Sequence, residues 1–238
     1  MAKAERNIGF EVLYKTLRRR FGFLNWWPGE TKDEIIIGAI LTQNTNWKNV
    51  EKAICNLKYE KLLDLESIAV INAGKLERLI RPSGFYRQKA ARLMDFARYA
   101  MQGYGGVDGF FKKGTQELRK ELLGLNGIGK ETADSIILYA AGKPIFVIDA
   151  YTRRILNRMW GIPYKAEYDD LRFLVEQEIR KDVDLYKDFH AQLVELAKRH
   201  CRKEPCCSEC PVNKMCSYGS YMQKLRERDS PLEQAWSA

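Results

Sequence analysis

No stretch of this 238-residue chain is apolar for long enough to cross a membrane. The longest apolar runs are Ile35–Leu41 and Ile136–Ala141, far short of the roughly 20 residues that a spanning helix requires. The N-terminal residues, MAKAERNIGFEV, are charged and contain no apolar segment of the kind found in an export signal. We therefore expect a cytoplasmic protein without membrane contact, in which cysteine thiols stay reduced.

Strand signals, internal repeats and Pro/Gly-rich linkers are also scarce. Only Pro144–Ile148 is strand-like, and it is too short to found a sheet. Helical spacing covers most of the remainder, and the predicted helices are Ile8–Phe21, Lys32–Leu41, Asn46–Leu57, Leu62–Ile71, Ala73–Ile80, Arg87–Gly103, Thr115–Leu123, Lys130–Ala141, Tyr151–Trp160, Asp169–Ile179 and Lys187–Arg199. The sequence therefore predicts an all-α protein with one large core or two small ones.

Positive charge is in excess. The chain has 40 lysines and arginines against 31 aspartates and glutamates, a net charge of +9. A soluble protein of this charge is expected to bind a polyanion such as nucleic acid.

Four cysteines near the C-terminus follow the spacing C-x5-C-x2-C-x5-C, and they are Cys201, Cys207, Cys210 and Cys216. A further cysteine, Cys206, lies inside the first gap. In a protein with reduced thiols, such a cluster indicates metal ligands rather than disulfides. Four thiolates suit an iron–sulfur cluster or tetrahedral zinc, and spacing alone does not separate the two. The isolated Cys55 is expected to be a small buried hydrophobic residue.

The segment L-N-G-I-G, followed by K-E-T-A, has the composition of a tight hairpin between two helices. Gly127 and Gly129 allow positive φ on either side of Ile128, which is predicted to plug the core. A helix starting at Lys130 would offer its first-turn N–H groups to a phosphate oxygen. The alternative is an ordinary helix–turn–helix corner with a glycine C-cap.

Asp149 ends the apolar run Ile145–Ile148, so its carboxylate is expected to be half-buried. Burial would raise its pKa, and a nearby helix N-terminus would lower it. The alternative role is that of an N-cap for the helix starting at Ala150. Both roles are compatible, because capping orients the carboxylate and leaves one oxygen for chemistry.

These motifs resemble the endonuclease III superfamily of DNA glycosylases, over most of the chain from about Asp33 to Cys216. L-N-G-I-G-K-E-T-A is similar to the family's helix–hairpin–helix, and V-I-D is similar to the segment with its catalytic aspartate. The resemblance implies that Asp149 has the catalytic role. It also implies that the partner is double-stranded DNA containing a damaged base, bound by a monomer.

The cysteine spacing resembles the family's [4Fe–4S] loop, with a first gap that is one residue shorter. The resemblance implies cluster ligation by Cys201, Cys207, Cys210 and Cys216, with Cys206 as the alternative to Cys207. It further implies two helical domains. One is a barrel with the helix–hairpin–helix over residues 31–143, and the other combines residues 1–30 with 144–238, the active-site cleft lying between them.

One departure bears on mechanism. Bifunctional members of the family have a lysine at the position of Glu131, and it forms a Schiff base with the sugar. Lys130 is one residue earlier, which is about 100° away around a helix, so it is expected to face phosphate instead. The chain is therefore expected to be monofunctional, releasing a free base and leaving an abasic site.

Two further segments predict a base pocket. Trp26-Trp27-Pro28 and L-T-Q-N-T resemble the 3-methyladenine glycosylase III branch, which excises N-alkylated purines. Cationic alkylpurines stack well on aromatic rings, although the two tryptophans could instead plug a domain junction. Glu131 and Lys198 are candidates to face the pocket, with a plain surface lysine as the alternative for Lys198. Members of that branch lack the cysteines that this chain has.

Four residues are candidates for contact with distorted DNA. Gln43 and Asn44 are expected to fill the space of a flipped nucleotide, or else to form a polar helix surface. Phe85 is a candidate wedge between bases, and Arg87 a candidate phosphate contact.

Three other functions remain open. One is a bifunctional glycosylase/lyase that uses Lys130, and another is a mismatch glycosylase for adenine, uracil or thymine. The third is a non-catalytic module that binds distorted duplex.

Overall fold

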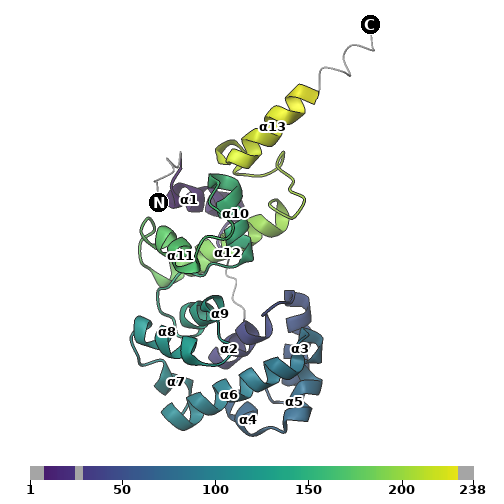
Figure 1. Ribbon diagram of the computed structural model, residues 1–238, viewed down its shortest axis with the longest axis vertical. Helices are drawn as coiled ribbons and strands as arrows, with labels where there is room; N and C mark the ends of the chain where they lie inside the picture. Colours follow the sequence, from purple (N-terminus) through teal and green to yellow (C-terminus); the bar gives the residue numbers. More distant parts are fainter. Residues whose placement is uncertain (1–7, 25–28, 230–238) are drawn as a thin grey trace. The chain divides into compact units, whose positions relative to one another are not determined.

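The computed structural model of the protein describes residues 8–24 and 29–229 (Figure 1). In those residues the chain forms helices and connecting segments, without a strand. The helices are α1 (Phe10–Phe21), α2 (Lys32–Leu41), α3 (Trp47–Tyr59), α4 (Leu65–Val70), α5 (Ala73–Ile80), η1 (Arg81–Ser83), α6 (Tyr86–Tyr104), α7 (Val107–Phe110), α8 (Thr115–Gly124), α9 (Lys130–Ser135), the π-helical turn η2 (Ile136–Ala140), α10 (Ala150–Trp160), α11 (Tyr168–Glu176), α12 (Val183–Arg199), η3 (Asn213–Met215) and α13 (Ser217–Asp229). None of the described helices is long and apolar enough to cross a membrane. The all-α prediction is confirmed.

The chain divides into two compact units. The first unit is Trp27–Ile145 and contains α2 to α9, and the second is Met1–Trp26 with Phe146–Ala238 and contains α1 and α10 to α13. In the first unit, α6 packs against α4 and α5, which lie beside it in Figure 1, and against α2 and α7. In the second unit, α12 packs against α1 and α10. Each unit has its own core of fully buried side chains, such as Ile36, Leu93 and Leu122 in the first and Leu13, Phe146 and Phe189 in the second.

Side-chain caps decide where two helices begin. The carboxylates of Asp64 and Asp182 accept hydrogen bonds from backbone N–H groups in the following turns, at 2.6 and 2.9 Å. Each cap satisfies a donor that has no acceptor within the helix. For this reason α4 begins at Leu65, later than the spacing predicts, and α12 begins at Val183, earlier than predicted. The helical spacing of apolar residues also did not predict the single turn α7.

The hairpin between α8 and α9 has one left-handed glycine. Gly127 has a φ of 76°, as expected, and a Cβ at this position would collide with the side chain of Arg92. Gly129 is extended, with φ −85° and ψ 173°, and precedes α9 as its N-cap. The hairpin therefore uses positive φ at one of the two glycines that allow it, because one left-handed residue is enough to reverse the chain. Ile128 is 5% exposed and plugs the core as predicted.

A buried ion pair joins the two helices of this motif. Arg119 on α8 donates to the two carboxylate oxygens of Asp134 on α9, from Nε at 2.6 Å and from Nη2 at 3.2 Å. The Asp134 side chain is fully buried. Such a bidentate pair fixes both distance and orientation.

We expect Arg119→Met to lower the free energy of unfolding by about 3–5 kcal/mol, because it leaves a buried carboxylate without its guanidinium. Chemical denaturation would measure the loss. The double substitution Arg119→Met/Asp134→Leu should recover most of the lost free energy of unfolding. An apolar pair of similar volume contains no buried carboxylate that needs the guanidinium. A double variant that is no more stable than Arg119→Met would contradict this explanation.

Cys55 corrects a prediction. It lies on α3 and is exposed, whereas the buried residues of that helix are Val50, Ala53, Ile54 and Leu57. Residues four apart on a helix share a face, and position 55 falls outside the apolar one. The expectation of burial for Cys55 was wrong because it rested on residue type and not on helical phase.

Candidate active site and cysteine pocket

Asp149 lies where an extended segment enters α10. It is the N-cap of that helix, and its Oδ1 accepts a hydrogen bond from the Thr152 backbone N–H at 2.7 Å. Its Oδ2 lies 3.7 Å from Nε2 of His190 on α12. The side chain of Asp149 is 16% exposed and that of His190 is 7% exposed. The start of α10 therefore holds one carboxylate oxygen by a hydrogen bond, and His190 of α12 lies within ion-pair distance of the other.

Side chains of α11 fix the backbone that leads to Asp149. The N–H of Phe146 donates to Glu176 Oε1 at 2.8 Å, and the N–H of Ile148 donates to the Tyr168 hydroxyl at 3.3 Å. A buried extended segment without a neighbouring strand must satisfy its N–H groups in another way, and these two side chains do so. The position of Asp149 is thus set by α11 as well as by the helix that it caps.

The pKa of Asp149 lies below its ordinary value of 3.8. Burial raises the pKa, but His190 and the Thr152 N–H together lower it by more. The positive end of the α10 dipole acts in the same direction. Asp149 is therefore an anion at neutral pH, in a site largely screened from solvent.

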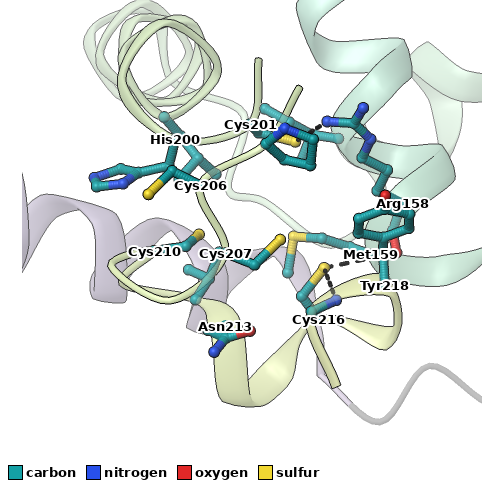
Figure 2. Close-up of a pocket in the computed structure, with 15 residues that line it drawn as sticks. Arg158, Met159, His200, Cys201, Cys206, Cys207, Cys210, Asn213, Cys216 and Tyr218 are labelled. Carbon is teal, nitrogen blue, oxygen red and sulfur yellow. Dashed lines mark hydrogen bonds between the residues drawn. The ribbon is translucent and has the colours of Figure 1, made fainter. Parts of the chain in front are cut away.

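The cysteines line one pocket in the second unit (Figure 2). Its wall includes apolar side chains from α10 and α12, and the cysteines are Cys201, Cys206, Cys207, Cys210 and Cys216. In Figure 2 the sulfur of Cys207 points toward the side of Cys216, whereas that of Cys206 points toward His200. Cys206 Sγ also contacts Ser208 Oγ at 3.9 Å.

Hydrogen bonds reach two of the sulfurs. Arg158 on α10 donates from Nη1 to Cys201 Sγ at 3.3 Å, and the Gly219 N–H donates to Cys216 Sγ at 3.4 Å. Arg158 also donates to the carbonyls of Arg202 and Lys203, at 2.6 and 3.0 Å. Donors aimed at sulfur stabilise thiolates and are typical of the surroundings of metal–thiolate centres.

Burial raises the pKa of the Cys210 thiol to about 11 and also raises that of Cys216. The pKa of Cys210 is raised further by the charges of Cys216, Cys201 and Cys207. The four thiols are thus close enough for electrostatic interaction. No group of three or more His, Cys, Asp or Glu side chains in the described residues is gathered closely enough to hold one metal ion.

Three of the predicted DNA-contact residues of the first unit, Gln43, Asn44 and Phe85, lie in loops, and Arg87 lies in the first turn of α6. Asn44 and Phe85 are exposed and have positive φ, 53° and 46°. Gln43 is instead engaged within the unit, because its Nε2 donates to Gly127 O at 2.9 Å and to Thr132 Oγ1 at 3.0 Å. Arg87 is exposed, at 80% of its side chain.

The remaining predicted site residues are exposed or lie outside the described part. Lys130 and Glu131 form the exposed first turn of α9, and Lys198 is exposed in the last turn of α12. Trp26 and Trp27 lie outside the described residues. The base pocket that they were predicted to form therefore stays a prediction.

Sequence reasoning missed His190, Lys89 and Arg158. His190 is one of only two histidines in the sequence, and this rarity could have marked it as a candidate site residue. Lys89 is 1% exposed, an unusual location for a lysine. Nothing in the sequence indicates that Lys89 is buried, because a lysine at this position is typical of the polar face of a helix.

Comparison with known proteins gives the family. Residues 37–181 match the model of the HhH-GPD superfamily base excision DNA repair proteins. MJ1434 of Methanocaldococcus jannaschii, provisionally named a DNA repair glycosylase, is 48% identical over 206 residues, covering 86% of this chain and 94% of that protein. The structure of Helicobacter pylori 3-methyladenine DNA glycosylase (MagIII) bound to 1,N6-ethenoadenine is similar with a TM-score of 0.73 and 32% identity, covering 81% of this chain and 98% of that one.

A non-covalent endonuclease III–DNA complex shares the fold with a TM-score of 0.77 and 20% identity, covering 94% of this chain and 100% of that one. The resemblance inferred from the hairpin, the V-I-D segment and the cysteines is confirmed. The chain belongs to the HhH-GPD superfamily of base excision DNA repair proteins, the endonuclease III-like DNA glycosylases.

Proposed function

We propose that the protein is a monofunctional DNA glycosylase that hydrolyses the N-glycosidic bond of a damaged base, an N-alkylated purine such as 3-methyladenine. The observation that carries the proposal is the position of Asp149, whose largely enclosed carboxylate accepts the Thr152 N–H with one oxygen and lies 3.7 Å from His190 Nε2 with the other. An anion so placed stabilises positive charge that develops on the sugar as the glycosidic bond breaks. It can also accept a proton from an attacking water.

The hydrolytic assignment depends on Glu131. In this chain a carboxylate occupies the position at which bifunctional relatives have the Schiff-base lysine, and Glu131 is exposed in the first turn of α9. A carboxylate cannot form an imine with the sugar. Water is then the acceptor, and the products are a free base and an intact strand with an abasic site.

We expect borohydride to trap no covalent complex between the wild-type protein and lesion DNA, because no lysine amine is at the reactive position. Glu131→Lys is expected to produce a trapped complex, visible as a shifted band on a denaturing gel. The matched control is Glu131→Gln, which removes the charge without adding an amine. Trapping by the wild-type protein would mean that another lysine, such as Lys130, performs lyase chemistry.

Alkylpurines are the proposed substrate class because of similarity to MagIII, whose solved structure carries 1,N6-ethenoadenine. The segment Trp26-Trp27-Pro28 supports the same class, since aromatic faces favour cationic rings. Alkylation at a ring nitrogen also weakens the glycosidic bond. A pocket with one carboxylate is then enough, and no strong general acid is needed.

Mass spectrometry of the free bases tests the substrate. The protein is incubated with a mixture of methylated, oxidised and deaminated DNA, and the released bases are identified. Release of 3-methyladenine or 7-methylguanine is the expected result. Release of adenine, uracil, thymine or an oxidised pyrimidine would overturn the alkylpurine assignment. No release from any lesion would favour a non-catalytic module for distorted duplex.

The cysteine pocket is proposed to hold a [4Fe–4S] cluster through Cys201, Cys207, Cys210 and Cys216. The residues fit such a group, because four thiols surround a shared apolar pocket and N–H donors reach two of the sulfurs. In a cluster of this kind each iron takes one thiolate, so the thiols surround the group and do not converge on one ion. The cluster would cross-link the loop after α12 to α13, and cleavage of a glycosidic bond needs no electrons from it.

A further inference from the structure

A buried carboxylate on α12 gathers hydrogen-bond donors from separate segments of the second unit. Asp188 is 2% exposed. Its Oδ2 accepts from the Tyr14 hydroxyl at 2.8 Å and from Arg18 Nη1 at 2.9 Å, both on α1. Its Oδ1 accepts from the Leu24 backbone N–H at 3.1 Å and from Gln192 Nε2 at 3.3 Å. With four donors, both oxygens of the carboxylate have all the partners that they can accept.

The same network holds the segment that follows α1. Gln192 Nε2 also donates to the Gly22 carbonyl at 2.7 Å, and Gly22 is the C-cap of α1 with a φ of 76°. The next residue, Phe23, is 57% exposed, so burial of its ring does not hold the segment in place. The segment Gly22–Leu24 is therefore fixed by hydrogen bonds at its first carbonyl and its last N–H.

The side chains of this network are placed by helical phase. Tyr14 and Arg18 are one turn apart on α1, and Asp188 and Gln192 are one turn apart on α12, so each pair shares a helix face. The packing of α1 against α12 brings the two pairs together. Burial and the hydrogen bond to Asp188 raise the pKa of Tyr14 to about 12, so its hydroxyl keeps its proton near neutral pH and remains a donor.

The helix that carries Asp188 also reaches the proposed catalytic carboxylate. His190 is two residues further along α12, and its Nε2 lies 3.7 Å from Asp149 Oδ2. Positions two apart on a helix are about 200° apart around its axis. One helix therefore holds Gly22–Leu24 on one side and faces Asp149 on the other.

Leu24 is the last described residue before the segment that contains the tryptophan pair Trp26-Trp27. The Cα of the first tryptophan lies within about 7 Å of that of Leu24, because two peptide links reach no further. We infer that Asp188 is a positioning residue for base recognition, which fixes the point from which the tryptophan pair reaches the damaged base and holds that point relative to Asp149. The inference rests on the proposed glycosylase function and its tryptophan pocket. Side chains that start from a fixed point lose less conformational freedom when a base binds.

The test separates base recognition from binding of the DNA backbone. Single-turnover release of 3-methyladenine from methylated duplex gives the half-saturating protein concentration and the rate at saturation. Fluorescence anisotropy of a duplex with a tetrahydrofuran abasic analogue gives binding without a base. For Asp188→Leu we expect the half-saturating concentration to rise by about tenfold, because the tryptophan pair is then ordered only on binding. The rate at saturation and the binding of the abasic duplex should change little.

Two variants distinguish positioning from stability. Asp188→Asn keeps an oxygen that accepts the Leu24 N–H, and Arg18, 39% exposed, can turn to solvent. Its half-saturating concentration is expected to stay close to that of the wild-type protein. Glu178→Leu removes the carboxylate that accepts the Phe10 N–H at the other end of α1, at 3.1 Å. It is expected to lower the melting temperature without raising the half-saturating concentration.

The double variant Trp26→Ala/Trp27→Ala shows whether Asp188 acts through the tryptophans. Adding Asp188→Leu to it should cause no further rise in the half-saturating concentration. If Asp188→Leu does not fold, Gln192→Met provides the test, since it removes only the hydrogen bonds to Gly22 and to one oxygen of Asp188. A smaller rise in the same direction is expected.

Three results would overturn the inference. The first is alkylpurine release with an unchanged half-saturating concentration in Asp188→Leu, or in Gln192→Met where that variant is used, and it leaves the proposed function intact. The second is a parallel loss of release and of abasic-duplex binding that Glu178→Leu reproduces, because Asp188 would then only stabilise α1. The third is a wild-type protein that releases no alkylpurine, which overturns the proposed substrate as well.

Discussion

Replacing Asp149 with asparagine is expected to lower the rate of base release by about 10²–10⁴-fold and to leave binding of lesion DNA in place. Asparagine is as good an N-cap as aspartate, so the hydrogen bond from the Thr152 N–H that starts α10 is retained. Only the negative charge is removed. Single-turnover release of the damaged base, measured beside DNA binding, separates the two effects. Equal losses of binding and turnover would show that Asp149 has only a structural role.

The pH dependence of turnover gives a second measurement on the same carboxylate. Because the pKa of Asp149 lies below 3.8, the residue stays ionised from neutral pH down to that range and imposes no loss of activity above it. Because the pKa of Asp149 is lower in the folded than in the unfolded protein, its ionisation stabilises the fold at pH values above the pKa of the unfolded state. This stabilisation is lost as the pH falls through the pKa of Asp149 in the folded protein. The acid limb of a pH–rate profile is therefore expected below pH 3.8.

His190 determines where that limb lies. His190→Gln removes a cause that lowers the pKa of Asp149 and leaves burial, which raises it. The acid limb should then move to higher pH, with little change in rate on the neutral plateau. An unchanged limb in His190→Gln would mean that the start of α10 alone keeps Asp149 ionised.

Cys207→Ser is expected to remove bound iron and the visible absorption of a [4Fe–4S] cluster, and to lower the free energy of unfolding by more than about 4 kcal/mol. The reason is that the binding free energy of a structural metal group contributes directly to folding. Iron content, absorption and thermal unfolding of protein purified without oxygen measure the effect. DNA binding should weaken as well, since the loop with Arg202 and Lys203 loses its cross-link.

The neighbouring cysteine provides a matched control. Cys206→Ser makes the same chemical change one residue earlier, at a side chain that points toward His200 in Figure 2. It is expected to retain iron and stability. The reverse pattern, with iron lost from Cys206→Ser and kept by Cys207→Ser, would reassign the second ligand. Equal iron retention in both variants would contradict the assignment of Cys207 as the required second ligand.

Local features determined much of this protein directly from its sequence. Helical spacing and caps such as Asp64 and Asp182 act within a few residues, so the all-α class and most helices could be predicted, and a closer reading of the caps would have corrected two starts. The hairpin and the spacing of the cysteines are also local features that the sequence shows directly. The resemblance of L-N-G-I-G-K-E-T-A to the family hairpin also placed Glu131 at the position where bifunctional relatives are expected to have lysine, and this stays a prediction.

Tertiary structure decided what depends on residues far apart in the chain. His190 reaches Asp149 across 41 positions, and Lys89 joins Leu41 to Ser83. Gln43 was predicted to fill the space of a flipped nucleotide or to form a polar helix surface, and only the tertiary structure shows that its amide binds the hairpin and Arg92. Such contacts form only when packing brings separate helices together. From the sequence alone, a polar residue that will make such a contact cannot be distinguished from other polar residues of the same helix. The physical reason is that capping and helical phase are set by neighbouring residues, whereas the partner of a buried polar group is set by the whole fold.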